Sequence, residues 1–159
     1  MLNLSIRHAK LNELPRVKYI TKLSYKIPYK TNTLVTKSHE PKNIQESFLN
    51  KEFFIIVAIL ENKIVGAVRY KLNEKNELYF YKLAVLKTHR SRGIGSKLVN
   101  EIEKVAEKKG CAKVLLDCAR EKKLPDYYKK LGYEINLVKK HLDHHDVYMS
   151  KRIKIKNSK

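Results

Sequence analysis

The sequence predicts a mixed α/β fold, in which a mostly antiparallel central sheet is flanked by helices. Short stretches rich in Val, Ile, Tyr and Phe occur before residue 86 and again after residue 132, and turn residues separate them. Between these groups lies a segment of helical spacing followed by one more strand-like stretch. That order is typical of a strand–helix–strand crossover. At 159 residues the chain suits one domain, so residues 1–159 are assigned to a single domain.

The first fifty residues contain one expected strand and two expected helices. Residues 2–7 alternate enough to predict a strand. A helix should follow, because apolar residues recur at mostly helical spacing, namely Leu11, Leu14, Val17, Ile20 and Leu23. Residues 31–42 are polar and irregular, and Pro41 opens a short helical stretch that runs to Leu49.

The middle of the chain predicts three consecutive strands. Residues 53–60 and 63–72 flank the tight turn Glu61-Asn62, which indicates a hairpin. Gly66 lies inside the second arm, where a glycine often marks a bulge. Residues 73–76 form another turn, and residues 78–86 give the third strand.

The remaining elements are the crossover and a final hairpin. The crossover helix carries one apolar face and ends at Gly110; the face consists of Ile94, Leu98, Ile102 and Val105. Residues 112–118 then predict a strand and residues 125–131 a short helix. Residues 133–138 and 147–155 complete the fold as a hairpin.

Composition favours a globular cytoplasmic protein that does not enter a membrane. Hydrophobic residues make up 43% of the chain, and the longest apolar run, residues 53–60, has only the length of a strand. The N-terminus reaches the charged pair Arg7-His8 too early for a secretory signal. Cys111 and Cys118 have neither metal-knuckle nor redox spacing, and thiols buried in a reducing compartment are expected.

The formal net charge of +19 raises the question of an anionic partner. The lysines are scattered along the chain without a run of five like charges, and the densest stretch, residues 151–156, partly alternates with apolar residues. Nucleic-acid binding as the main role is therefore disfavoured. The charge would still help to attract a polyphosphate ligand.

The segment His89-Arg90-Ser91-Arg92-Gly93-Ile94-Gly95-Ser96 joins a strand directly to the crossover helix. Glycines at 93 and 95 let the backbone approach a ligand closely, and the first turn of a helix offers unpaired N–H groups and partial positive charge. Arg90 and Arg92 reinforce a pyrophosphate site of this kind. The dinucleotide fingerprint fails because Leu98 stands where its third glycine belongs, and the order and spacing of a P-loop are absent. A glycine-tightened turn without a ligand is the alternative.

Two motifs here resemble the GNAT superfamily of N-acetyltransferases. Arg90-x-x-Gly93-x-Gly95 resembles the Arg/Gln-x-x-Gly-x-Gly/Ala signature of that family, with Val85 five residues before the arginine. The segment from Tyr127 to Tyr133 resembles its Phe-Tyr-x-x-Leu-Gly-Phe landmark, and one helix and one strand separate the two. The resemblance covers most of the chain, although residues 1–50 match only in pattern.

The resemblance implies a fold and a cosubstrate. In this family the sheet is splayed at the cofactor site, where the pantetheine arm of acetyl-CoA lies like an extra strand. The matching backbone groups here are those of Leu83 and Val85. The pyrophosphate would be held by the N–H groups of the glycine loop, namely Arg90, Ser91, Arg92, Gly93, Ile94, Gly95 and Ser96. Many members carry an asparagine where this chain has Glu121, so that family contact is not carried over.

Tyr128 matches the family's tyrosine that points at the cofactor sulfur. Attack of an amine on a thioester expels a thiolate whose conjugate acid has a pKa of about 8.5, and a phenol of pKa about 10 stays protonated at neutral pH and can donate to it. Tyr128 is therefore the predicted general acid, whereas Tyr127 is expected only to pack. Packing of both rings is the alternative.

The acceptor is expected to be an amine, either a small molecule or a peptide, that must lose a proton. Glu77 starts the strand that carries Tyr79 and Tyr81, so we expect Glu77 to act as the base, through water, or else to be a turn residue. The family varies its acceptor loops, which would here be residues 24–50 and 138–146. A homodimer is left open.

Three histidines, His141, His144 and His145, resemble a metal site, but a solvated hairpin loop is favoured and no metal is expected.

An inactive CoA-binding domain, or a basic nucleic-acid-binding domain of the same fold, is the alternative to an enzyme.

Overall fold

The computed structural model describes residues 3–25 and 40–155. The strands and helices follow one another along the chain in the expected order. The strands are β1 (Leu4–His8), β2 (Phe54–Leu60), β3 (Lys63–Leu72), β4 (Leu78–Val85), β5 (Lys113–Ala119), β6 (Glu134–Lys140) and β7 (His145–Arg152). The α-helices are α1 (Leu14–Tyr25), α2 (Ile44–Leu49), α3 (Ile94–Lys108) and α4 (Leu124–Lys130), and short 3-10 turns precede α1, follow β4 and follow β5.

The strands form one sheet in the order β1-β2-β3-β4-β5-β7-β6. The pairs β1–β2, β2–β3, β5–β7 and β6–β7 are antiparallel, and β4 pairs with β5 in parallel. The parallel pair is the consequence of the crossover through α3, because two parallel strands need a long connection between them. A mixed, mostly antiparallel sheet with flanking helices was predicted, and that prediction is confirmed.

Packing divides the chain into two compact units. The described parts of residues 1–71 and 82–102 form the first unit, and residues 72–81 with 103–155 belong to the second. Both β4 and α3 therefore contribute one part to each unit. The assignment to a single domain remains a prediction.

In the first unit, the hairpin of β2 and β3 turns at Glu61 and Asn62, whose φ angles are 49° and 66°. Two consecutive left-handed residues make the turn type whose twist matches that of paired strands. The β2–β3 register shifts beside Ala58, which pairs with Gly66, so the predicted bulge lies next to this glycine. A side chain at Gly66 would come within 3.2 Å of the Ala84 carbonyl and of Leu98, which explains the need for glycine at this position.

Strand β3 is buried along consecutive residues from Ile64 to Tyr70, which shows that both faces of this part of the sheet are covered. Helix α1 buries Leu14, Val17 and Ile20, and Arg16 in the same helix donates to the Ile64 carbonyl at 3.1 and 3.2 Å. The other two residues of the predicted apolar face, Leu11 and Leu23, are exposed. Helix α2 begins later than predicted, because Asn43 and not Pro41 caps it, accepting from the Glu46 N–H at 3.1 Å.

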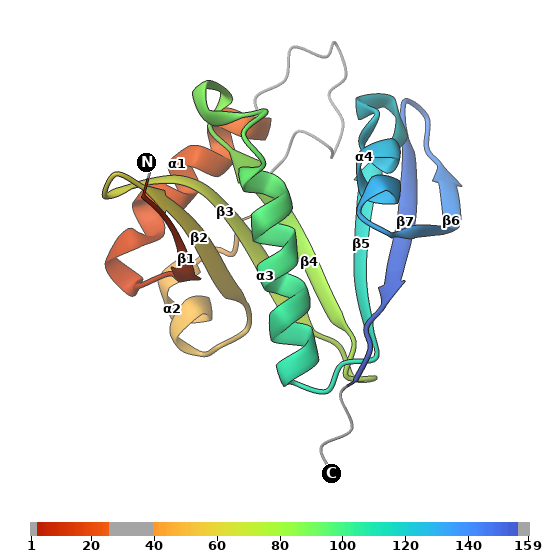
Figure 1. The fold of residues 1–159 in the computed structure, drawn as a ribbon, viewed down its shortest axis with the longest axis horizontal. Helices are drawn as coiled ribbons and strands as arrows, with labels where there is room; N and C mark the ends of the chain where they lie inside the picture. Colours follow the sequence, from red (N-terminus) through yellow and green to blue (C-terminus); the bar gives the residue numbers. More distant parts are fainter. Residues whose placement is uncertain (1–2, 26–39, 156–159) are drawn as a thin grey trace. The chain divides into compact units, whose positions relative to one another are not determined.

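In the second unit, α3 ends at Lys108, and Gly110 closes it as predicted, because its φ of 67° lets the Cys111 N–H reach the Ala106 carbonyl at 2.9 Å. Figure 1 shows α4 beside β5 and β7, with β6 at the edge of this unit. Strand β7 lies between β5 and β6 and buries Val147 and Met149, whereas every residue of β6 is exposed.

Parts of four predictions lie outside the described residues: position 2 of the first strand, the irregular segment at 31–39, most of the first acceptor loop, at 26–39, and position 156 of the basic stretch.

Candidate functional site

The predicted phosphate loop lies in the first unit, between β4 and α3. Ser91 and Gly93 have φ angles of 63° and 77°, so the chain takes two left-handed steps before the helix starts. Lys97 donates to the Gly93 carbonyl at 3.0 Å, which is the first bond of the helical pattern. The first turn of an α-helix offers N–H groups and partial positive charge to an anion, and this turn is the N-terminus of α3.

The surroundings of Gly93 leave room for a ligand. A Cβ built at this residue would meet no atom within 4 Å, so open space lies beside the backbone. Arg90, Ser91 and Arg92 are exposed in the same turn, and Ile94 is buried and fixes the start of α3. Gly95 and Ser96 follow in the first turn of that helix. The seven predicted loop residues therefore form one continuous structural feature.

The two backbone groups of β4 that were predicted to contact the cofactor already accept hydrogen bonds from side chains of this protein. The Leu83 carbonyl accepts from the Tyr25 hydroxyl at 3.4 Å. The Val85 carbonyl accepts from Arg90 Nε at 3.1 Å and from the Ser24 hydroxyl at 3.4 Å. The C-terminal end of α1 is thus tied to this end of β4, which the sequence did not reveal, because side-chain bonds to backbone carbonyls leave no spacing pattern.

Tyr128 lies in the second unit, on α4, and only 6% of its surface is exposed. Its ring packs against Phe80, Tyr127 and Tyr133, with centroids 6.0, 5.1 and 6.0 Å away. The chain turns after it at Gly132, whose φ is 95°, and the Tyr133 N–H returns to the Tyr128 carbonyl at 3.0 Å. The second sequence landmark is thus a helix with its C-terminal cap, and it holds Tyr128 in an aromatic cluster.

Glu77 lies in the turn that precedes β4. Its carboxylate accepts from the Asn73 side chain at 3.0 Å, and its own N–H donates to Asn73 Oδ1 at 2.9 Å. The expected common face of Tyr79 and Tyr81 is present, since their rings stack with centroids 5.4 Å apart. The alternation of β4 does not continue, because Lys82 has a φ of 51°.

Glu121 binds the first residue of β7, His145. Its carboxylate accepts from the His145 N–H at 3.0 Å and lies 2.6 Å from His145 Nδ1. Although the partial burial of Glu121 acts to raise its pKa, these bonds from His145 lower the pKa to about 2.

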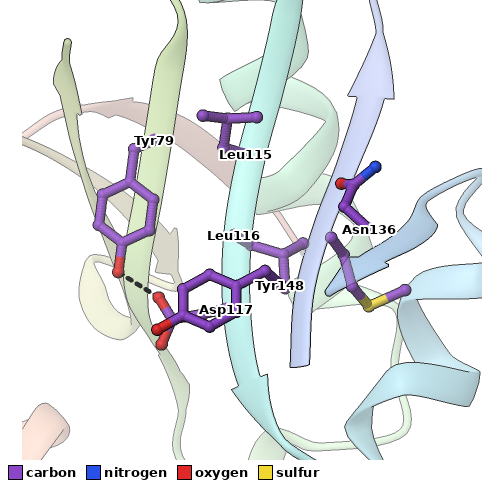
Figure 2. Close-up of a pocket in the computed structure, with 7 residues that line it drawn as sticks. Tyr79, Leu115, Leu116, Asp117, Asn136 and Tyr148 are labelled. Atoms are coloured by element: carbon purple, nitrogen blue, oxygen red, sulfur yellow. Dashed lines mark hydrogen bonds between the residues drawn. The ribbon is translucent and has the colours of Figure 1, made fainter. Parts of the chain in front are cut away.

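A pocket of about 450 Å³ opens on the second unit, and Figure 2 shows its lining. The Tyr79 hydroxyl donates to the Asp117 carboxylate, and Tyr148 lies directly opposite Asp117 in the β5–β7 register. Burial and the neighbouring Asp117 raise the pKa of Tyr79, so its hydroxyl stays protonated. The lining is completed by Leu115, Leu116, Asn136 and Met149.

Asp117 was not singled out from the sequence. The available signal was its place in the strand between the buried residues Leu116 and Cys118, where alternation directs it away from the core. The pocket brings together two aromatic rings and a carboxylate, which is the chemistry that holds an organic cation. The Lys139 ammonium already lies 5.3 Å from the centroid of the Tyr148 ring.

The predicted residues are therefore distributed between the two units. Leu83, Val85 and the loop from Arg90 to Ser96 belong to the first, and Tyr128 and Glu77 belong to the second. In the part of the chain that the structure describes, no helix combines the length and the apolar character needed to cross a membrane.

Comparison with known proteins agrees with this geometry. The model of the acetyltransferase (GNAT) family matches residues 18–133, a range that contains the glycine loop and the Tyr128 segment. An uncharacterised N-acetyltransferase of Bacillus subtilis, YjcF, is 32% identical over 112 residues, which cover 69% of this chain and 76% of that protein.

Solved structures show the same fold. A GNAT-family acetyltransferase from Streptococcus pneumoniae superposes with a TM-score of 0.75 at 21% identity, covering 96% of this chain and all of that one. YncA of Salmonella typhimurium, solved with its cofactor acetyl-CoA, superposes with a TM-score of 0.77 at 12% identity, covering 99% and 98% of the two chains. By the family match and the identity to YjcF, this chain belongs to the GNAT acetyltransferase family.

Proposed function

We propose that this protein transfers the acetyl group of acetyl-CoA to an amine. The observation that carries the proposal is the turn from Ser91 to Ile94, where two left-handed residues present the N-terminus of α3 with open space beside Gly93. Such a helix start binds a pyrophosphate through its N–H groups and its partial positive charge.

The residues of the turn fit the diphosphate of coenzyme A. Gly93 lacks the side chain that would fill the space, and the exposed Arg90 and Arg92 add two permanent cations to the N–H groups. The net charge of +19 also favours the approach of a polyanion. When bound, acetyl-CoA supplies an acetyl group activated as a thioester. Leu83 and Val85 would line the pantetheine arm, which would have to compete with the Tyr25, Ser24 and Arg90 side chains for their carbonyls.

Tyr128 supplies the proton for the departing thiolate. Its phenol is a donor at neutral pH, and the aromatic cluster around it fixes the ring. The support for this role is the match to the family landmark, together with the Gly132 cap that orients the end of α4. Purely structural packing of the ring is the competing explanation.

The acceptor is an amine that arrives as an ammonium ion and must release a proton before it attacks. Glu77 acting through a water molecule is one candidate acceptor of that proton, and its engagement by Asn73 favours the competing role of a turn residue. Asp117 is a second candidate, because it lies in an aromatic pocket suited to a cation. The two candidates can be distinguished by the pH dependence of kcat/KM in variants that lack one carboxylate or the other.

The test is a panel of amines incubated with acetyl-CoA, in which thiol release and the mass of the acetylated product are both followed. The panel contains polyamines, amino sugars, lysine peptides and peptides with a free N-terminus. Product formation with at least one amine supports the proposal. Tight binding of acetyl-CoA without product from any class would identify an inactive CoA-binding domain, and binding of nucleic acid alone would identify the basic-module alternative.

The two buried cysteines form no disulfide, which agrees with a cytoplasmic setting for this enzyme.

A further inference from the structure

A cluster of histidine and aspartate side chains lies at the end of the β6–β7 hairpin, apart from the residues assigned to acetyl transfer. The turn at residues 141–144 connects β6 to β7, and Asp146 is the second residue of β7. His141, His144 and Asp146 each offer one ligand atom, and these atoms lie within 4.8 Å of one another. The geometry points to a divalent metal site at this hairpin end, with Zn²⁺ as its ion.

Distances within the cluster are those of a metal coordination shell. His141 Nε2 lies 3.0 Å from Asp146 Oδ2, and His144 Nε2 lies 3.3 Å from Asp146 Oδ1. In a tetrahedral zinc site with bonds of about 2.0–2.2 Å, neighbouring ligand atoms are about 3.4 Å apart. The two histidine nitrogens contact different oxygens of the same carboxylate, at distances slightly shorter than that spacing between ligand atoms.

The local structure holds the ligands in place. The His141 N–H donates to the His144 carbonyl at 2.8 Å, and the two rings stack with centroids 4.5 Å apart and an angle of 11°. His144 Nδ1 lies 2.7 Å from Asp143 Oδ1. A carboxylate on Nδ1 holds that proton and leaves Nε2 free to bind a metal, as in the carboxylate–histidine–zinc arrangement.

The donor set selects the class of ion. Two imidazole nitrogens and one carboxylate suit Zn²⁺ and neighbouring transition metals, whereas Ca²⁺ and Mg²⁺ prefer oxygen donors alone. Three protein ligands leave a fourth position for water. The sequence favoured a solvated loop because no cysteine is near; the missing partner was Asp146, which reaches the histidines only because the hairpin folds back.

Bound Zn²⁺ would join the turn to the start of β7. His141 follows the last pair of the β6–β7 register, Lys140 with His145, so a metal shared with Asp146 closes the hairpin beyond that pair. Since β6 is exposed along its whole length, this closure would stabilise the strand that packing secures least. Because Zn²⁺ would bind the folded hairpin and not the unfolded chain, it should raise the melting temperature by mass action.

The experiment titrates the full chain, without a histidine tag, with ZnCl₂ in a buffer that does not chelate metals. Calorimetry should give one Zn²⁺ per chain, and Co²⁺ should show the absorption of a tetrahedral site. His144→Ala and Asp146→Asn should abolish saturable binding. Asp143→Asn should weaken it about 10- to 100-fold, the range seen when an outer carboxylate is lost.

His89→Gln is the matched control, because His89 lies in the other unit and its loss should leave the affinity unchanged. Circular dichroism of each variant shows whether it is folded. If His144→Ala or Asp146→Asn does not fold, the affinity of Asp143→Asn, the mildest change, decides the test. The proposed site would be overturned by unchanged Zn²⁺ affinity in all three variants, His144→Ala, Asp146→Asn and Asp143→Asn. It would also be overturned if His89→Gln weakened Zn²⁺ binding as much as those variants do. No readout here depends on acetyl transfer.

Discussion

The guanidinium of Arg69 is buried in β3 and forms a two-pronged ion pair with Glu40, its Nη1 and Nη2 lying 2.6 and 2.7 Å from the two carboxylate oxygens. Lys82 approaches the same carboxylate at 3.6 Å, and the Phe53 ring centroid lies 5.6 Å from the guanidinium. Arg69 is 1% exposed, and its Nε has no hydrogen-bond partner among the described residues. Glu40 is therefore the main compensation for a buried cation.

Removal of Glu40 should leave Arg69 buried without its counter-charge. Breaking a buried pair in this way costs about 3 kcal/mol, so Glu40→Ala should lower the free energy of unfolding by about that amount. Arg69→Met together with Glu40→Ala should recover part of the loss, because no charge then stays buried. Urea denaturation of both variants measures the difference. A double variant no more stable than Glu40→Ala would show that the carboxylate matters for another reason.

The same pair should make stability depend on pH. Burial acts to raise the pKa of Glu40, but the hydrogen bonds and charge of Arg69, aided by Lys82, lower it below its ordinary value. A carboxylate with a depressed folded pKa stabilises the protein above its unfolded pKa of about 4.3 and loses that contribution as pH falls through the folded value. Glu40→Gln should flatten the decline in unfolding free energy between pH 5 and pH 3. An equally steep decline would assign the acid sensitivity to other carboxylates.

Tyr128→Phe tests the general acid. The change keeps the ring and its contacts with Phe80 and Tyr133, so folding and acetyl-CoA affinity should persist. If the hydroxyl protonates the thiolate, kcat should fall roughly 10²- to 10⁴-fold with the best amine found. Tyr127→Phe is the control on the adjacent residue and should be nearly silent. Undiminished turnover of Tyr128→Phe, with chemistry rate-limiting, would reject the role.

The two candidate bases should differ in the pH dependence of kcat/KM. Loss of the true base should give a slower enzyme that regains activity as rising pH deprotonates the amine in solution. If Asp117 holds the ammonium, Asp117→Asn should show that recovery together with a higher KM, whereas Glu77→Gln should give a profile parallel to the unmutated one. The reverse pattern would return the role to Glu77. Two unchanged profiles would exclude both carboxylates.

Much of this architecture could be predicted from the sequence because it rests on local signals. The Glu61-Asn62 turn, the apolar face of α3 and the glycines at 93 and 110 each have a physical requirement that residue type reveals. The position of β7 between β5 and β6 could not be predicted, since pairing order depends on contacts distant in sequence. The same limitation hid the partners of Asp117 and Asp146, which meet their neighbours only across strands or around a hairpin.

Binding of acetyl-CoA at the turn around Gly93 is the central claim, and a thermal melt with and without the ligand tests it most directly. Gly93 and Gly110 form a matched pair, because both have a positive φ and an added Cβ would meet no atom within 4 Å at either, so each alanine costs about 1–2 kcal/mol of backbone strain. Acetyl-CoA at a hundred times its Kd should stabilise the unmutated protein and Gly110→Ala by about 2.7 kcal/mol, and Gly93→Ala should lose most of that shift. A melt of the unmutated protein that millimolar acetyl-CoA leaves unchanged, or an equal shift in Gly93→Ala, would contradict the account.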